Sequence, residues 1–507
     1  MARPREGGTP RKPYSSTDSS AEEFESSRSN ASSTALQLPE IGTSEHDITL
    51  NYYATEHSFD QERLEGSSLV DRWLCQFTGA GVNAPSVPAS VVEFYDKSYH
   101  YLQQSYFYKM IEHVSPGSAT LWTQTQVQDA ASLHGLYAAG SAVAVRLAPD
   151  NGAKTKLRTI AREYYTRSLM IMQVRIQNGE NLERIAYDTA SLLVYTSALN
   201  DWPSYRVHLD GMRHIVMLLG GVGPVNLAVR LLLLVGESQA ASHMLTRSTS
   251  RPLEWGTPSW HANPDLAEAR HLFKIDNVQR HALAPGGIIQ PSVDRLLKEI
   301  QDFHSILTQC CMSENALNTM DNARRWLTMK FFALTQRIVN VYCDSSQNKL
   351  FRTQNDFINS IEGLERAFLV ALLCYHQCVY YAKTNPSLLS SRHVPFHHVK
   401  RHLEQFTGNP EHLKTIASPE VLEALTWISF VATYEDGLNE GDLIHGGVSG
   451  WSSNFCHQMI SLQQTSIRTG NDLRNQLMKV SYCDSVFGPS LHRLWDQMHR
   501  RKGPHTY

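Results

Sequence analysis

Apolar residues recur at helical spacing along most of this chain. From about residue 68 they return every three or four positions, as Leu69, Trp73 and Phe77 do, and the strict alternation of a strand never takes hold. No repeat of fixed length and no heptad run emerges. We therefore predict an all-α fold, an irregular multi-helix array in which helix pairs pack into a superhelix.

Three successive helices are the best defined by this pattern. The segments 154–177 and 181–199 each gather their apolar residues on one face, and Asn178-Gly179 separates them. A third helix is expected over 204–219, and the pair Gly220-Gly221 suits the left-handed cap that ends a helix. Further helices are expected at 292–312, 317–343, 357–382, 395–405, 419–434, 451–467 and 471–480.

Two stretches of the chain lack the helical pattern. Residues 1–65 hold clustered Ser and scattered charge with almost no apolar periodicity, so we expect a disordered tail. Residues 66–500 are expected to form the helical domain. Within it, the Pro, Gly and Trp residues between 248 and 292 predict a connection between two halves, 66–250 and 290–500.

Composition argues against several classes of protein. The net charge is −3, with 46 Lys and Arg against 49 Asp and Glu, which gives no overall field for nucleic acid or anionic lipid. The 8 cysteines lack the dense spacing of a disulfide framework, so we expect reduced thiols. The strongest apolar run, 231–235, is far shorter than the roughly 20 residues of a membrane span. The N-terminus is basic and Ser-rich, unlike a secretory signal, so a nuclear or cytoplasmic protein without membrane contact is expected.

One group of residues has ligand chemistry suited to zinc. Cys374 and Cys378 are one helical turn apart, and so are His398 and His402, which makes four potential ligands. The cysteines, however, lie in the apolar run 368–381, where a thiol behaves as a small hydrophobe. We therefore predict a core role for them, and neither a bound metal nor another cofactor.

Motifs of catalysis and of DNA reading are incomplete. The stretch 446–450 resembles a nucleophile elbow but lacks its glycine spacing and a preceding strand. The glycines at 220–223 lack the strand and downstream acid of a dinucleotide site. The basic residues 500–502 are expected to be a solvated end rather than a DNA contact. We expect no enzyme activity and assign no catalytic or DNA-binding residue.

The stretch 181–222 carries a family resemblance. A tryptophan leads into a short "His-Leu-x-Gly" helix that closes at a glycine pair, through Trp202, His208, Leu209, Gly211, Met212, Gly220 and Gly221. This order resembles the regulatory helical domain of fungal zinc-cluster transcription factors, and weaker likeness extends over about residues 90–500. In structural terms we expect Trp202 to be a large buried anchor, Gly211 to permit close helix packing, and Gly220-Gly221 to cap the helix.

The resemblance implies control of transcription in the nucleus. It implies pairing as a homodimer or with another transcription factor, and a response to a small-molecule effector. Such factors carry six closely spaced cysteines that bind zinc, and residues 1–74 contain no cysteine. DNA contact is therefore expected to be indirect, or to come from an upstream module that this chain lacks.

We thus expect a transcription regulator that acts through protein contacts or effector sensing by its helical domain. If an apolar pocket exists, Trp202, Trp326, Trp427 and the stretch 393–402 are candidate linings, although core packing suits the tryptophans better. Two alternatives stay open. One is a helical interaction scaffold, and the other is a metal-dependent enzyme built on Cys374, Cys378, His398 and His402.

Overall fold

Every segment that the structure describes is a helix or a connection between helices. The computed structural model describes residues 97–115, 117–126, 130–248, 259–273, 290–312, 321–347, 356–391, 396–407, 418–439, 451–463 and 465–501. No strand occurs in these ranges, and the predicted all-α array is confirmed. The expected tail 1–65 and the residues Leu69, Trp73 and Phe77 lie outside the described residues.

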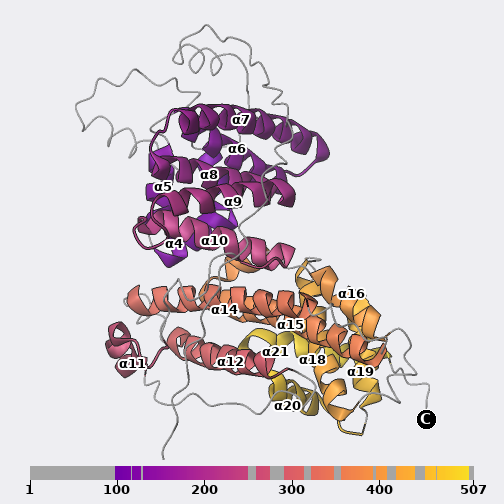
Figure 1. Cartoon of the computed structure of the whole chain (residues 1–507). Helices are drawn as coiled ribbons and strands as arrows, with labels where there is room; N and C mark the ends of the chain where they lie inside the picture. The colour runs from indigo at the N-terminus through magenta and orange to yellow at the C-terminus, as the bar shows by residue number, and fades with distance from the viewer. Residues whose placement is uncertain are drawn as a thin grey trace, which may run out of the picture. The chain divides into compact units, whose positions relative to one another are not determined.

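The helices follow one another along the chain as Figure 1 labels them. The first group is α4 (Tyr106–Val114), α5 (Ser118–Gln126), α6 (Ala130–Leu147), α7 (Asn151–Gln177), α8 (Leu182–Ala198), α9 (Trp202–Leu218) and α10 (Leu227–Met244). Short helices η2 (Pro264–Leu266) and α11 (Ala267–Phe273) follow. The last group is α12 (Pro291–Cys311), α14 (Asp321–Gln347), α15 (Asp356–Thr384), η4 (Pro386–Ser391), α16 (Phe396–Thr407), α18 (Pro419–Asn439), α19 (Trp451–Leu462), α20 (Gly470–Val480) and α21 (Asp484–Arg501).

Side-chain caps explain where the predicted helix trio begins. Asp150 accepts a hydrogen bond from the Ala153 N–H at 2.8 Å before α7, and Asn181 accepts from the first turn of α8. Asp201 does the same for α9, which starts at Trp202 with Pro203 in its first turn. Each cap satisfies an N–H group that the helix itself leaves unpaired.

Helix α8 is the centre of the first group. Its residues from Ile185 to Ala198 are buried on every side, because α6, α7, α9 and α10 all pack around it. The first-group helices lie in layers in Figure 1, with α7 at one edge and α10 at the other. The prediction of one apolar face for α8 was therefore too narrow, although its boundaries were close.

Five of the longer described helices lie outside the ranges predicted from the pattern: α4, α5, α6, α10 and α21. Helix α10 is buried along most of its length, so it shows a continuous apolar run rather than a periodic face. Helix α21 carries Pro489 inside it, although its buried residues Phe487, Leu491, Leu494 and Met498 keep helical spacing. The predicted connection 248–292 also contains helical structure, since η2 and α11 lie within it; its Pro285-Gly286-Gly287 turn lies outside the described residues.

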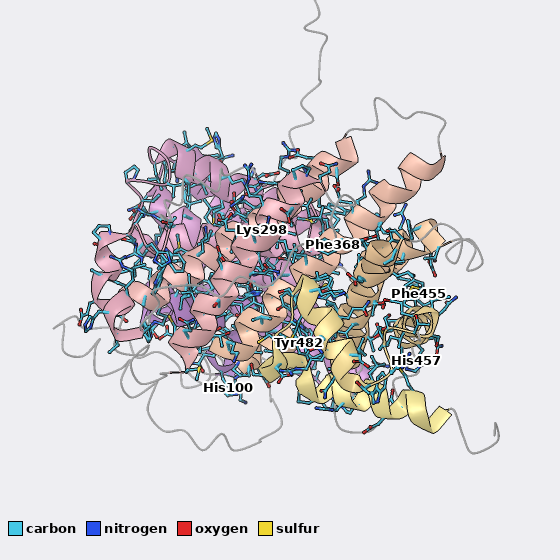
Figure 2. All side chains as sticks on the ribbon, turned by 90° about the horizontal axis from the view of Figure 1, so that it is seen from below. His100, Lys298, Phe368, Phe455, His457 and Tyr482 are labelled. Atoms are coloured by element: carbon cyan, nitrogen blue, oxygen red, sulfur yellow. The ribbon has the colours of Figure 1, made fainter. Side chains whose placement is uncertain are left out.

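The second group packs around α15. Helices α12, α14, α16 and α18 contact α15, and α21 reaches it from the C-terminal end. Phe368 of α15 is fully buried, and Figure 2 shows the side chains that fill the spaces between these helices. All described helices of both groups belong to one compact unit, and α10 contacts α14. None of the described helices combines the length and the hydropathy that a membrane crossing requires.

Candidate functional site

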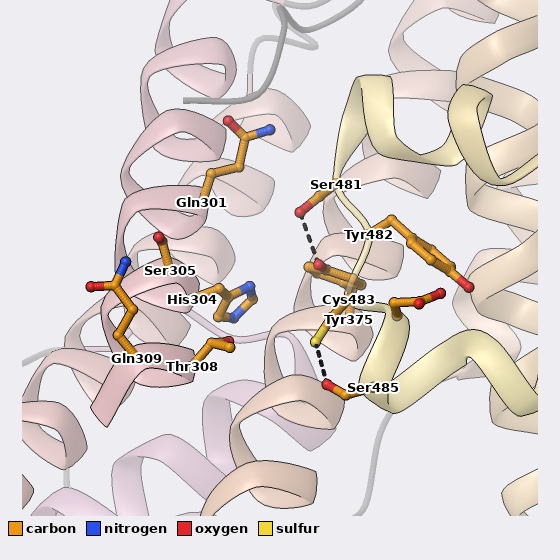
Figure 3. A pocket seen from close by; sticks show the side chains of 11 residues that line it. Gln301, His304, Ser305, Thr308, Gln309, Tyr375, Ser481, Tyr482, Cys483 and Ser485 are labelled. Carbon is orange, nitrogen blue, oxygen red and sulfur yellow. Dashed lines mark hydrogen bonds between the residues drawn. The ribbon is translucent and has the colours of Figure 1, made fainter. Parts of the chain in front are cut away.

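A cavity of about 540 Å³ lies between α12, α15 and the segment that joins α20 to α21. We call it the α12 pocket. Among the described residues that line it, Asp484 is the charged one; the described lining is Gln301, His304, Ser305, Thr308, Gln309, Tyr375, Ser481, Tyr482, Cys483, Asp484 and Ser485. Figure 3 shows His304 and Thr308 of α12 pointing toward the side of the cavity where Tyr375 and Cys483 lie.

The α12 wall follows from helical spacing. Positions 301, 304, 305, 308 and 309 share one face, because they are separated by three, four, seven and eight residues. The other side of α12 carries Leu296, Ile300, Phe303 and Leu307, all buried. Burial of the apolar face in the core therefore orients the polar face of α12 toward the pocket.

The opposite wall is held in place by the core. The Trp427 Nε1–H donates to the Ser481 carbonyl at 2.6 Å, and the Ser481 hydroxyl donates to the Tyr375 Oη at 2.9 Å. The Tyr375 ring stacks on Phe487 with centroids 5.3 Å apart. The Cys483 carbonyl accepts from the first turn of α21. These contacts give the 481–485 segment a fixed backbone at the rim of the pocket.

A pair of buried histidines backs the pocket. His304 Nε2 lies 3.0 Å from His376 Nδ1, and His376 Nε2 lies 3.2 Å from the Phe331 carbonyl oxygen. His304 lines the cavity and is 6% exposed, whereas His376 is fully buried in α15.

The hydrogen bonds of this pair fix where its protons lie. A carbonyl oxygen can only accept, so His376 Nε2 carries a proton and His376 Nδ1 is an acceptor. His304 Nε2 must then donate to it. If both rings are neutral, His304 Nδ1 is left as a bare lone pair. Among the described residues none donates to His304 Nδ1, although this atom is buried.

Burial keeps both imidazoles neutral. Desolvation lowers the pKa of His376 to about 4, with the Phe331 carbonyl acting in the opposite direction. Desolvation and the neighbouring His376 hold the pKa of His304 well below its usual value. At neutral pH the His304 ring is therefore neutral, with a buried hydrogen-bond acceptor at Nδ1. Its basicity is too low for efficient proton abstraction at that pH.

Comparisons with known proteins give no match. No family model matches the chain, and neither the curated proteins nor the solved structures contain a protein found to be similar to it. The resemblance over 181–222 therefore remains an expectation from sequence.

The tryptophans proposed as pocket linings lie elsewhere. Trp427 is fully buried, and Trp326 packs against Trp260 in the core with ring centroids 5.0 Å apart. Trp202 is partly buried, and its ring stacks on His243 with centroids 3.5 Å apart and contacts Tyr205. None of these tryptophans and no residue of 393–402 is among the described residues that line the α12 pocket, so the apolar pocket expected there stays a prediction.

The four residues drawn as a zinc group have other contacts. Cys374 and Cys378 are fully buried in α15, and the Cys378 thiol donates to Glu435 Oε1 at 2.9 Å. His402 Nε2 lies 3.0 Å from the Tyr342 hydroxyl, and His398 is half-buried on the preceding turn of α16. Within the described ranges no three His, Cys, Asp or Glu side chains are placed to share a metal ion. The elbow-like stretch 446–450 lies outside the described residues.

The family-like residues of α9 divide into core and surface. Leu209 and Met212 are buried, and His208 Nε2 lies 2.8 Å from the Tyr165 hydroxyl of α7. Gly211 is exposed, and a Cβ added there would meet no atom within 4 Å, so its expected role in close helix packing was wrong. Gly220 and Gly221 have φ of 94° and 95°, which confirms the left-handed cap.

The pocket was missed because its parts are far apart in sequence. Residues 304, 375 and 483 come from three segments, and no local pattern brings them together. One signal was available: an uncharged polar face, Gln301 to Gln309, on a helix whose earlier exposed positions include Lys298. Such a face differs from the charged surface expected for a solvated helix.

Proposed function

We propose that this chain is a nuclear transcription regulator whose helical domain senses a small-molecule effector in the α12 pocket. The family resemblance over 181–222 motivates the transcriptional role. The observation that carries the sensing role is the buried side chain of His304, which lines a cavity of about 540 Å³ and whose Nδ1 has no donor among the described residues. Cavities of roughly 300–1,000 Å³ hold small molecules, and an unsatisfied buried acceptor is a place for a ligand donor.

Binding rather than catalysis is the better use of this site. The His304 imidazole has too low a pKa for proton abstraction near neutral pH, yet a neutral lone pair is a good hydrogen-bond acceptor. The proposal therefore assigns no reaction to the α12 pocket and no catalytic residue. It includes pairing with a second copy or with another transcription factor, and indirect contact with DNA.

The pocket lies where a ligand could affect the arrangement of helices. Its walls belong to α12, α15 and the α20–α21 joint, so a bound molecule would contact three elements of the second group. A ligand that binds one arrangement more tightly shifts the population toward it, by an amount equal to its difference in affinity.

A tethered reporter assay tests the transcriptional role. The full chain is fused to an unrelated DNA-binding domain and expressed in fungal cells with a reporter gene that carries the matching site. We expect reporter output to differ by about fivefold or more from that of the DNA-binding domain alone. Output equal to that of the DNA-binding domain alone, with the fusion expressed and nuclear, would contradict the proposal.

A further inference from the structure

We infer that the α12 pocket binds an uncharged small molecule with a hydroxyl or N–H donor, and that it discriminates against anions. This inference rests on the proposed function and deepens it, because it names the class of effector. It follows from the charge, the hydrogen-bonding capacity and the size of the lining.

The lining offers no counter-charge to an anion. Among the described residues that line the pocket there is no Lys or Arg, and the charged one is Asp484. Its carboxylate is paired with Arg474, with N–O distances of 3.1 and 3.2 Å. The N-terminus of α21 could attract an anion, but Asp484 already places a carboxylate in that first turn. An anionic ligand bound beside the Asp484 carboxylate would lose its hydration without gaining a positively charged partner.

The buried end of the pocket matches a group that both donates and accepts. His304 Nδ1 is an acceptor, and a carboxylate or phosphate oxygen has no proton to give it. The Tyr375 hydroxyl accepts from Ser481, and no described residue takes the proton of Tyr375. The His304 and Tyr375 rings lie 5.2 Å apart, centroid to centroid. A ligand hydroxyl or primary amide is the kind of group that could pair with either side chain, by donating to His304 or by accepting from Tyr375.

The remaining lining suits the same class of ligand. Ser305, Thr308 and Gln309 line the cavity, and their side chains have no hydrogen bond to another described residue. Hydroxyl and amide side chains pair well with uncharged polar groups at little desolvation cost. The volume of about 540 Å³ accommodates a molecule of metabolite size.

The rate at which the Cys483 thiol is alkylated can test this inference without a known ligand. It is half-buried at the pocket wall, with its Sγ 3.4 Å from the Ser485 hydroxyl. Iodoacetamide and iodoacetate are similar in size. Iodoacetamide is uncharged and carries an amide N–H donor, whereas iodoacetate is an anion without such a donor. Each forms an S–C bond as the C–I bond breaks, releasing iodide, while the thiol proton passes to solvent. Peptide mass spectrometry of the full chain gives the rate at each cysteine separately.

We expect the ratio of the iodoacetamide rate to the iodoacetate rate at Cys483 to exceed that of glutathione by about tenfold. Gln309→Lys adds a cation at the half-buried rim and should bring the ratio down to the glutathione value or below it. The matched control Gln173→Lys, on the exposed side of α7, should leave the ratio unchanged. His304→Phe should slow iodoacetamide more than iodoacetate.

A ratio at Cys483 equal to that of glutathione in the unsubstituted chain would overturn the inference. So would a preference for iodoacetate, or a Cys483 that neither reagent modifies while Cys343 reacts. The Gln309→Lys result stands even if His304→Phe fails to fold. Because alkylation is measured on purified protein, these outcomes do not depend on the reporter assay, and each proposal can fail without the other.

Discussion

His304 of α12 and His376 of α15 share a hydrogen bond that sets which ring nitrogen of each carries the proton. His376 is fixed by the Phe331 carbonyl and by burial, and it fixes the tautomer of His304 in turn. Protonating either ring would bring a positive charge into the core beside another imidazole. At the scale of single residues, the acceptor at the pocket wall is thus set by a group that does not touch the pocket.

Acid should destabilise the fold through these histidines. His376 has a pKa of about 4 in the folded chain, below its value of 6.5 when exposed. Between these values the unfolded chain binds a proton that the folded chain does not, so stability falls as pH falls. From about pH 6.5 to about pH 5.5, one such group lowers the free energy of unfolding by about 1 kcal/mol. Urea unfolding at both pH values measures this loss.

The variant His376→Gln removes this titration and keeps an amide that can donate to Phe331. Its loss of stability over the same pH interval should be smaller by about 1 kcal/mol than that of the unsubstituted chain. Equal losses in both proteins would show that His376 is not a neutral buried group.

At the scale of elements, the glycines of α9 and its cap should respond to substitution with opposite signs. Gly211→Ala fills open space on a helix and should raise the free energy of unfolding by about 0.5–1 kcal/mol. Gly220→Ala imposes a side chain at φ of 94°, with its Cβ 3.1 Å from Pro224 Cγ, and should lower it by about 1–2 kcal/mol. Denaturant unfolding measures both changes. The same sign for both would contradict this account of the family-like helix.

The close helix packing expected at Gly211 occurs at a different glycine. A Cβ at Gly140 in α6 would come within van der Waals overlap of the Ser98 backbone, at 2.8 Å from its Cα. In the sequence, Gly211 and Gly140 are both glycines within helical runs. They differ only in the structure, where the backbone at Ser98 passes close to Gly140 and no atom lies near Gly211. The local sequence predicts a helix cap such as Gly220-Gly221 well, because the positive φ that favours glycine arises within a few residues. It predicts contacts between distant segments poorly.

The difference between local requirements and contacts with distant segments also explains which helices could be predicted from the sequence. The boundaries of α7, α8 and α9 follow from caps and breaks within a few residues, such as Asp150 and Asn181. Helix α10 depends on neighbours on all sides, so its sequence has no polar face to give its period. The pocket depends on three distant segments, and only the uncharged face of α12 pointed to it.

At the scale of the whole molecule, buried polar contacts link the two groups of helices. Glu237 of α10 is 1% exposed and accepts from Arg213 of α9 at 2.9 Å and from Gln336 of α14 at 3.3 Å. Gln377 of α15 donates to Ser242 of α10 at 2.7 Å. Such contacts are directional, so they specify one alignment of α10 on α14 and α15 more strongly than apolar packing does. The predicted boundary between halves falls in the connection after α10.

The most direct test of a pocket that controls output is the tethered reporter with paired pocket variants. The fusion carrying Gln309→Lys is compared with the fusion carrying Gln173→Lys and with the unsubstituted fusion, at equal expression and nuclear level. If effector binding in the α12 pocket controls transcription, Gln309→Lys should change reporter output by about fivefold or more, and Gln173→Lys should leave it unchanged. Equal output from all three fusions would contradict the account.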